Sequence, residues 1–410
     1  MKNGLNEVPR SSTFATLFHP MRNTTSLLPP QALVFACAVF LISCAETGTE
    51  EAASDNIPVI ATAIPAPEPL QLPELPDSLD RGYEQEVYFD NVRQLTYGGD
   101  NAEAYWSFDG RSLVFQATNP SWNTDCDQIY VMDLSDGTPS SEPPAPVSTG
   151  LGRTTCAFFM PGDTTVLYAS THAADTACPE TPRRGPNNEY VWPIYAGYDI
   201  YTAPIGGGEP TLLIGGEGYD AEATVSPQGD KIVFTSTRGG DLDLYTCDID
   251  GSNIKQITQK LGYDGGAFFS PDGQYLVWRA SRPELGAPVD EYVNLLKRGL
   301  VQPTEMELYI GRVDGTEIRQ ITNLGGANWA PYFHPDGQHI LFSSNHKTGA
   351  FPFNIFMTDI NGMDPVQVSF DNAFDSFPMF SPDGKRIAFS SNRNNGRTRS
   401  TNVFVADWIE

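Results

Sequence analysis

The same short pattern occurs six times in this chain: an apolar run, a tight turn of the Ser-Pro-Asp-Gly kind, and a second apolar run. The turns lie at residues 107–110, 160–163, 226–229, 270–273, 334–337 and 381–384. Proline and glycine suit such bends, and the apolar runs have the length of strands rather than helices. A repeat of roughly 45 residues describes one supersecondary unit that cannot bury its faces alone, so neighbouring units must pack together.

Further strand-length runs complete the repeat. Third strands are predicted at residues 243–248, 354–359 and 402–407, and fourth strands at 254–258, 318–322 and 365–369. Four antiparallel strands in each of six repeats predict an all-β, six-bladed β-propeller. Residues 92–96 have the fourth-strand pattern but precede the first turn, whereas the chain ends after a third strand. We therefore expect this N-terminal strand to complete the last blade and close the ring.

The N-terminal segment has a different character. Residues 31–43 form a short apolar stretch that is followed by Cys44, a pattern that resembles a bacterial lipobox with Cys44 as the lipidated residue. These thirteen residues are too few to span a bilayer. The sequence predicts a lipoprotein signal peptide over residues 1–43, starting at Met1 or Met21, and a disordered acidic, Pro-rich tether over 44–80. The propeller then occupies residues 81–410.

The chain is strongly acidic, with a formal net charge of −26. Such a charge argues against nucleic acid or anionic lipid head groups as partners. A lipid anchor is then the expected contact with a membrane, and the protein is expected in a bacterial envelope, facing the periplasm or the cell surface.

Four cysteines lie in the predicted propeller. Cys126, Cys156 and Cys178 fall in connections that open on one face of the ring, and an exported protein favours a disulfide among them. We expect Cys178 to pair with one of the other two, while Cys247 lies mid-strand as a buried thiol. No Cys-x-x-Cys motif or histidine pair lies near these cysteines, so no zinc site is expected there.

The spacings between turns are uneven, at 53, 66, 44, 64 and 47 residues. The two long intervals contain insertions at residues 172–198 and 283–304, both between second and third strands and hence on one face. The second insertion is expected to contain a short helix over residues 290–298. The first carries aromatic side chains that either bind a ligand or fold the loop onto the rim: Tyr190, Trp192, Tyr195 and Tyr198.

Alignment of the repeats on their turns predicts two rings of polar side chains. Carboxylates and amides that precede or enter first strands are expected at the channel mouth, at Asn101, Glu103, Asp220, Glu222, Asp264, Asn328 and Asp375. Second strands end in an outer ring of cations, at His172, Arg238, Arg282, His346 and Arg393. Three roles are open for the two rings: they form structural ion pairs with each other, they hold a cation such as Ca²⁺ in the channel, or they bind a basic or polar peptide. No other cofactor is expected.

Signals for catalysis are weak. The chain has no G-x-S-x-G motif, and a metal-dependent lyase would want several histidines near the axis. Glu103 and Glu222 have the chemistry for acid–base work, but a place in the ring does not by itself raise a pKa. A non-catalytic protein is therefore the favoured expectation.

Residues 234–238 (Phe-Thr-Ser-Thr-Arg), 389–393 (Phe-Ser-Ser-Asn-Arg) and 381–384 (Ser-Pro-Asp-Gly) resemble the WD-like repeats of TolB-type propellers. Residues 190–193 and 299–303 are similar to a lipoprotein subgroup of that superfamily. The resemblance covers residues 85–410 and implies an envelope scaffold that binds a protein or peptide partner. The alternative is a glycan-binding or glycan-processing propeller, in which the loop aromatics stack on sugar rings.

Overall fold

The computed structural model describes residues 80–135, 143–182, 184–395 and 398–410. The predicted signal segment, Cys44 and the predicted tether up to residue 79 lie outside these residues. The chain divides into two units, residues 1–62 and 63–410, and all described residues belong to the second. No helix among them has the length and hydrophobicity needed to cross a membrane.

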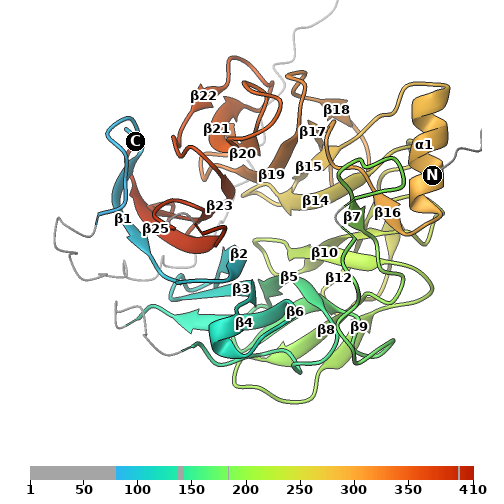
Figure 1. Cartoon of the computed structure of the whole chain (residues 1–410), viewed down its shortest axis with the longest axis horizontal. Helices are drawn as coiled ribbons and strands as arrows, with labels where there is room; N and C mark the ends of the chain where they lie inside the picture. Colours follow the sequence, from blue (N-terminus) through green and yellow to red (C-terminus); the bar gives the residue numbers. More distant parts are fainter. Residues whose placement is uncertain (1–79, 136–142, 183, 396–397) are drawn as a thin grey trace, which may run out of the picture. The chain divides into compact units, whose positions relative to one another are not determined.

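Six antiparallel sheets follow one another along the chain and form the six blades of a propeller, as predicted (Figure 1). In each blade the first strand lies next to the centre of the ring and the last at its outside. Blade 1 contains β2 (Asp100–Trp106), β3 (Ser112–Thr118) and β4 (Gln128–Asp133). Blade 2 contains β5 (Thr154–Phe159), β6 (Thr165–Ser170), β8 (Asp199–Pro204) and β9 (Thr211–Ile214). Blade 3 contains β10 (Asp220–Val225), β11 (Lys231–Ser236), β12 (Asp243–Asp248) and β13 (Lys255–Gln256). Blade 4 contains β14 (Asp264–Phe269), β15 (Tyr275–Ala280), β17 (Glu307–Arg312) and β18 (Arg319–Gln320). Blade 5 contains β19 (Asn328–Phe333), β20 (His339–Ser344), β21 (Asn354–Asp359) and β22 (Val366–Gln367). Blade 6 contains β23 (Asp375–Phe380), β24 (Arg386–Ser391), β25 (Asn402–Trp408) and β1 (Phe89–Gln94).

The ring closes through its two ends. β1 pairs antiparallel with β25, so the N-terminal strand is the fourth strand of blade 6. This confirms the predicted closure, although the strand begins three residues earlier than expected. Closure of this kind removes two exposed strand edges.

Blade 1 departs from the four-strand pattern within the described residues. Its sheet contains three strands, and the outer position holds a single bridge between Tyr130 and Pro146, followed by a hydrogen bond from Val147 N to Ile129 O of 2.8 Å. A proline has no N–H for a ladder, which limits pairing at this edge. A 3₁₀ helix, η2 (Pro120–Trp122), lies between β3 and β4.

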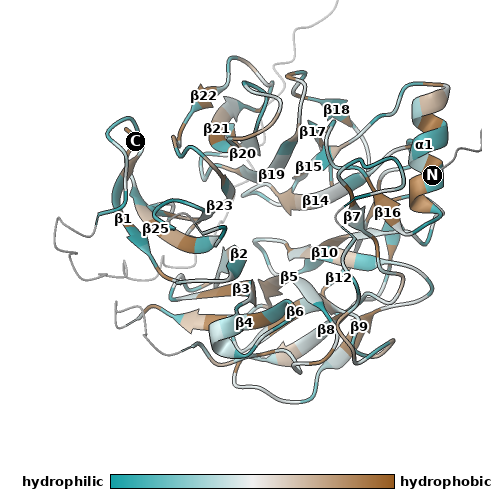
Figure 2. Ribbon diagram, in the orientation of Figure 1, coloured by the Kyte–Doolittle hydropathy of each residue, from teal (hydrophilic) through white to brown (hydrophobic). Residues whose placement is uncertain are grey.

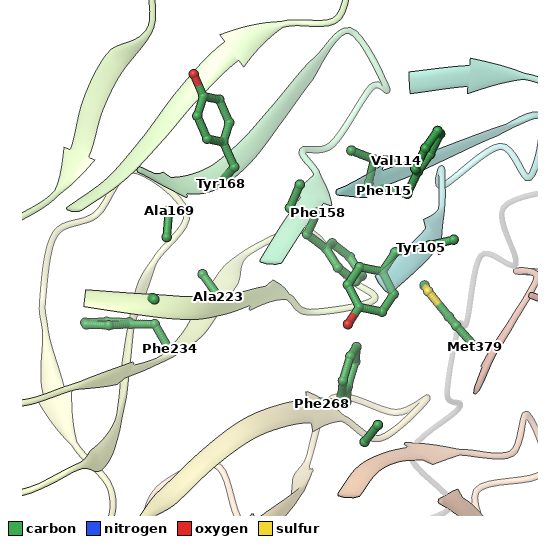
Figure 3. Packing of buried hydrophobic residues seen from close by; sticks show 14 of the residues in the cluster. Tyr105, Val114, Phe115, Phe158, Tyr168, Ala169, Ala223, Phe234, Phe268 and Met379 are labelled. Atoms are coloured by element: carbon green, nitrogen blue, oxygen red, sulfur yellow. The ribbon is translucent and has the colours of Figure 1, made fainter. Parts of the chain in front are cut away.

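Apolar side chains fill the space between blades, and hydrophobic and hydrophilic residues are interspersed along the strands (Figure 2). Near the axis, Tyr105, Phe158 and Phe268 converge from three different blades (Figure 3). Their ring centroids lie 5.6–6.5 Å apart, and Tyr332 adds a fourth ring 5.1 Å from Phe268. We call these four side chains the aromatic floor, because they fill the middle of the ring.

The two insertions meet each other. β7 (Trp192–Pro193), from the first insertion, pairs with β16 (Leu300–Val301), from the second, and Ile194 N donates to Gly299 O at 2.6 Å. Helix α1 (Ala287–Leu296) confirms the predicted helix with somewhat earlier bounds. Its Leu295 packs with Val191 and Leu300 in a small separate core. We call the joined insertions, residues 172–198 and 283–304, the roof.

Candidate functional site

A β-bulge occurs at the same position in the first strand of every blade. The register of each first strand shifts between its second and fifth or third and sixth residues, and one residue there has a positive φ of 45° to 59°. The six residues are Glu103, Cys156, Glu222, Gly266, Ala330 and Phe377, and all six line one cavity. A bulge bends its strand and re-aims the side chain that it carries. The bulges therefore turn one residue from each blade toward the axis.

The cavity has a volume of about 440 Å³. Tyr105 and Phe268 of the aromatic floor line its base. The roof contributes the four predicted loop aromatics, Tyr190, Trp192, Tyr195 and Tyr198, to its lining. The site is thus a largely aromatic chamber between the ring and the roof, in the size range of small-ligand sites.

One of the two bulge carboxylates is fully engaged. Glu222 accepts hydrogen bonds from Thr235 Oγ1 at 2.7 Å, Tyr263 OH at 2.5 Å and Gly266 N at 2.9 Å. It also forms an ion pair of 2.5 Å with Arg279 Nη2. A Cβ atom at Gly266 would lie 1.8 Å from Arg279 Nη1, so the glycine leaves the space that this guanidinium occupies. The network links blades 3 and 4.

The other bulge carboxylate lacks such a partner. Glu103 accepts a hydrogen bond of 3.3 Å from Tyr105 OH, and among the described residues no lysine or arginine lies within ion-pair distance of it. Burial raises the pKa of Glu103 to about 7, against smaller lowering contributions from Cys156 and Arg279. The nearby charge of Glu222 raises the pKa of Glu103 further. Burial likewise raises the pKa of the Cys156 thiol well above its ordinary value, with the Glu103 charge adding to the effect.

The other predicted channel-mouth residues do not line the cavity. Asn101, Asp220, Asp264, Asn328 and Asp375 are buried inside their blades, with exposed fractions of 0–2 %. Of the seven residues predicted at the mouth, the structure brings only Glu103 and Glu222 to the chamber.

Three arginines of the predicted outer ring bind aspartates of their own blades. Arg238 Nη2 lies 2.8 Å from Asp220, Arg282 Nη2 lies 2.6 Å from Asp264, and Arg393 Nη2 lies 3.1 Å from Asp375. Arg393 also binds Glu86, at 2.9 Å. The arrangement is the structural alternative that the sequence left open, and it pairs with arginine three of the carboxylates that were considered as Ca²⁺ ligands.

The two histidines of the outer ring differ from the arginines. His172 Nδ1 lies 2.8 Å from Ser170 Oγ and its ring contacts Tyr201, while His346 Nδ1 lies 2.8 Å from Ser344 Oγ. Burial lowers the pKa of both imidazoles below the ordinary value of 6.5. They are thus neutral at neutral pH, and the expected ring of five cations contains three.

The aromatic residues of the roof contact one another and the ring. Trp192 packs against Trp329 with the two rings tilted and their centroids 5.0 Å apart, and the Arg279 guanidinium lies 5.4 Å from the Trp192 ring. Tyr195 OH donates to Glu180 O at 2.6 Å. These contacts hold the roof over the chamber and occupy the Trp192 ring.

The structure joins Cys126 and Cys178 in a disulfide, one of the two pairings that the sequence left open. The bond ties the first insertion to blade 1. Cys156 remains a free thiol in the chamber wall, and Cys247 is a buried thiol, as expected.

Alignment on the turns did not identify Arg279, Tyr263 or the aromatic floor. The floor had a usable signal: Tyr105, Phe158, Phe268 and Tyr332 each lie two residues after a bulge position, so a second alignment would have shown an aromatic ring. Arg279 had no such signal, because no other repeat has arginine at the matching position.

Residues 300–405 match the family model of the TolB beta propeller domain. Among solved structures, the chain is similar to a putative TolB from Agrobacterium tumefaciens, with a TM-score of 0.50 and 20% identity over 76% of this chain and 91% of that one. It is also similar to TolB from Acinetobacter baumannii (TM-score 0.48, 18% identity, 74% of this chain and 64% of that one) and to an oligogalacturonate lyase in complex with manganese (0.45, 13%, 80% and 96%). No curated protein matches the chain significantly in sequence. Residues 300–405 are thus similar to the TolB beta propeller domain, and the likeness to the putative TolB shows a shared propeller fold.

Proposed function

We propose that this protein is a non-catalytic envelope scaffold that binds a protein or peptide partner through its roofed face. A cationic group of the partner, a lysine or arginine side chain or an amino terminus, enters the chamber beside Glu103. The observation that supports the proposal is Glu103 itself: a partly buried carboxylate among aromatic rings, with which no lysine or arginine of the described residues forms an ion pair.

The chemistry of the chamber matches such a ligand. A buried carboxylate without a counter-ion is costly, and an incoming cation removes this cost while the partner buries apolar surface. Aromatic faces also attract ammonium and guanidinium groups when water is excluded. Tyr105 provides such a ring and hydrogen-bonds Glu103 directly. A cationic ligand therefore gains from both the charge and the rings.

Binding is favoured over catalysis because the chamber offers one free carboxylate. Glu222 is held by Arg279, and Asp127 is ion-paired with Arg153. Hydrolysis of a glycosidic bond ordinarily uses two carboxyl groups in different protonation states. Glycan stacking is disfavoured as well, because Trp192 already packs against Trp329 and Arg279.

The cellular location in this proposal rests on the sequence. The lipobox-like pattern at Cys44 provides a lipid anchor, and the acidic segment after it provides a tether for the propeller. The TolB-type fold accords with an envelope protein. The net charge of −26 disfavours nucleic acid as the partner.

The proposal is tested by affinity capture from envelope extracts with the full chain as bait. Three baits are compared: wild type, Glu103→Lys and Glu317→Lys. Glu317 is exposed and lines a groove beside the turns of blades 4 and 5, away from the chamber, so both variants change the net charge equally. Thermal unfolding of each bait establishes that it is folded.

A partner retained by wild type and Glu317→Lys but lost with Glu103→Lys is the expected result. Equal retention by all three folded baits contradicts a role for the chamber. Loss with both variants indicates a general charge effect and also contradicts the proposed site.

A further inference from the structure

Two histidines and an aspartate converge on the turn between β19 and β20, outside the chamber. One donor atom from each of His334, Asp336 and His339 lies within 4.8 Å of the other two. Among the residues that the structure describes, no other group of three histidine, cysteine or carboxylate side chains converges in this way. The cation considered from the sequence was one held by the channel carboxylates, and neither His334 nor His339 was among the predicted site residues.

The other repeats show what this turn does without histidine. In blade 6, Ser381 Oγ donates to Asp383 Oδ1 at 2.6 Å and accepts from Arg386 N at 3.0 Å, which closes the turn. Blades 1, 3 and 4 also have serine at this position. Only the turn in blade 5 has histidine at both its first position and the start of its second strand. The histidines are therefore not required by the turn itself.

The two carboxylate oxygens of Asp336 contact different groups: one accepts hydrogen bonds from the turn backbone, and the other lies beside the two imidazoles. Asp336 Oδ1 accepts from Gln338 N at 2.7 Å and His339 N at 3.0 Å, and so holds the turn. Asp336 Oδ2 lies 3.2 Å from His334 Nδ1 and 2.7 Å from His339 Nδ1. Both imidazole nitrogens thus lie beside Asp336 Oδ2, and nitrogen and oxygen donors of this kind are ones that late divalent metals bind.

The three side chains differ in how tightly they are packed and how exposed they are, and this difference favours metal binding. His334 is packed against Phe380 and Trp408, and its side chain is 15% exposed. His334 Nδ1 accepts a hydrogen bond of 3.2 Å from Asp336 N, so its lone pair is directed into the turn. Asp336 and His339 are 39% and 44% exposed, which lets His339 adjust by a small rotation and leaves one side open to solvent.

We propose that His334, Asp336 and His339 form a binding site for a zinc-like divalent cation. Imidazole nitrogen and carboxylate oxygen bind Zn²⁺ at about 2.0–2.2 Å, and three protein ligands leave a coordination position for water or a group of a partner. A metal bound at His334 Nδ1 replaces the hydrogen bond from Asp336 N, and the exposed His339 supplies the closing movement. Hydrogen bonds between the imidazoles and Asp336 are the competing explanation of the cluster, and they predict no saturable metal binding.

Calorimetric titration of the full chain with Zn²⁺, without a polyhistidine tag, tests the site. The variants are His334→Ser, which restores the residue found at four other turns, and His339→Gln. His346→Gln serves as a matched control, because it removes a histidine of the same blade outside the cluster. Unfolding temperatures without metal show that each variant is folded, and Ca²⁺ is titrated as a hard-cation comparison.

The expected result is one saturable Zn²⁺ site per chain, with affinity reduced about tenfold or more in both cluster variants and unchanged in His346→Gln. Ca²⁺ should not compete. Absence of saturable binding in wild type, or equal affinity in wild type and His339→Gln, overturns the proposal. Neither outcome bears on the chamber.

Discussion

Two glutamates at equivalent bulge positions show how environment assigns different roles to one residue type. Glu222 receives a guanidinium and three further hydrogen bonds, whereas Glu103 interacts with the Tyr105 hydroxyl and the Cys156 thiol and forms no ion pair with a described residue. Their backbones are alike, with φ values of 57° and 55°. The difference comes from the neighbouring blade: Gly266 leaves the space in which Arg279 pairs with Glu222.

Substitution Glu103→Gln should stabilise the protein at high pH. The pKa of Glu103 is raised from 4.5 to about 7, so between these values the folded protein holds a proton that the unfolded chain releases, and stability is lost as pH rises. Glutamine removes this loss. As pH rises from about 5 to about 9, we expect the free energy of unfolding of the variant to increase by about 2 kcal/mol relative to that of wild type, as measured by urea unfolding. If the free energies of unfolding of the two proteins changed in parallel with pH, the raised pKa of Glu103 would be contradicted.

The sequence predicted Glu103 and Glu222 near the channel mouth, and the structure places both in the chamber lining, at bulges that the sequence did not predict. Asp220 and Glu222 were both expected at the channel mouth because they precede or enter a first strand. In a regular strand, residues i and i+2 point to the same side. The bulge at Glu222 breaks this alternation: Glu222 faces the chamber and Asp220 faces the blade interior. A positive φ at a glutamate leaves no trace in composition or spacing.

Between elements, the ion pair of Arg279 on β15 with Glu222 on β10 joins two blades. Arg279→Ala leaves a buried carboxylate without its cation and should reduce the free energy of unfolding by about 3–5 kcal/mol. The double variant Arg279→Ala/Glu222→Ala should lose less than the sum of the single variants. Additive losses in a double-mutant cycle would show that the two groups do not interact.

The disulfide makes a similar link between the roof and blade 1. Cys126 and Cys178 are 52 residues apart, and removal of a bond that closes such a loop costs about 2–4 kcal/mol. Cys126→Ser/Cys178→Ser should therefore unfold at a lower denaturant concentration. Cys247→Ser is the comparison, since Cys247 is a free thiol and its loss leaves the cross-link intact. An unchanged midpoint in the double variant would show that the disulfide does not stabilise the fold.

The elements themselves were largely predictable, because turn chemistry and apolar alternation are local. Third strands such as Asn354–Asp359 match their predicted bounds, while fourth strands such as Val366–Gln367 are shorter than expected. The pairing of β7 with β16 was not predictable. These two-residue strands come from insertions about a hundred residues apart and carry no repeat pattern.

For the whole molecule, stability depends on closure of the ring by β1. Its Val92 and Phe89 pack with Phe389 and Phe404 of blade 6 in a core separate from the main one. Truncation of residues 1–94 should expose β25 as an edge and abolish cooperative unfolding, because blade 6 loses its fourth strand. Truncation of residues 1–79 provides the control and should keep the unfolding midpoint of the full chain. Cooperative unfolding at that midpoint in both truncations would contradict closure as a requirement.

The chamber as a cation-binding site is tested most directly by selection from a displayed random peptide library. The full chain and its Glu103→Lys variant are each used as the target at about pH 8, where Glu103 is ionised. Wild type should enrich peptides with a lysine, an arginine or a free amino terminus at one fixed position, and Glu103→Lys should not. Enrichment of the same peptides by both targets, or of peptides without a cation, would contradict the account.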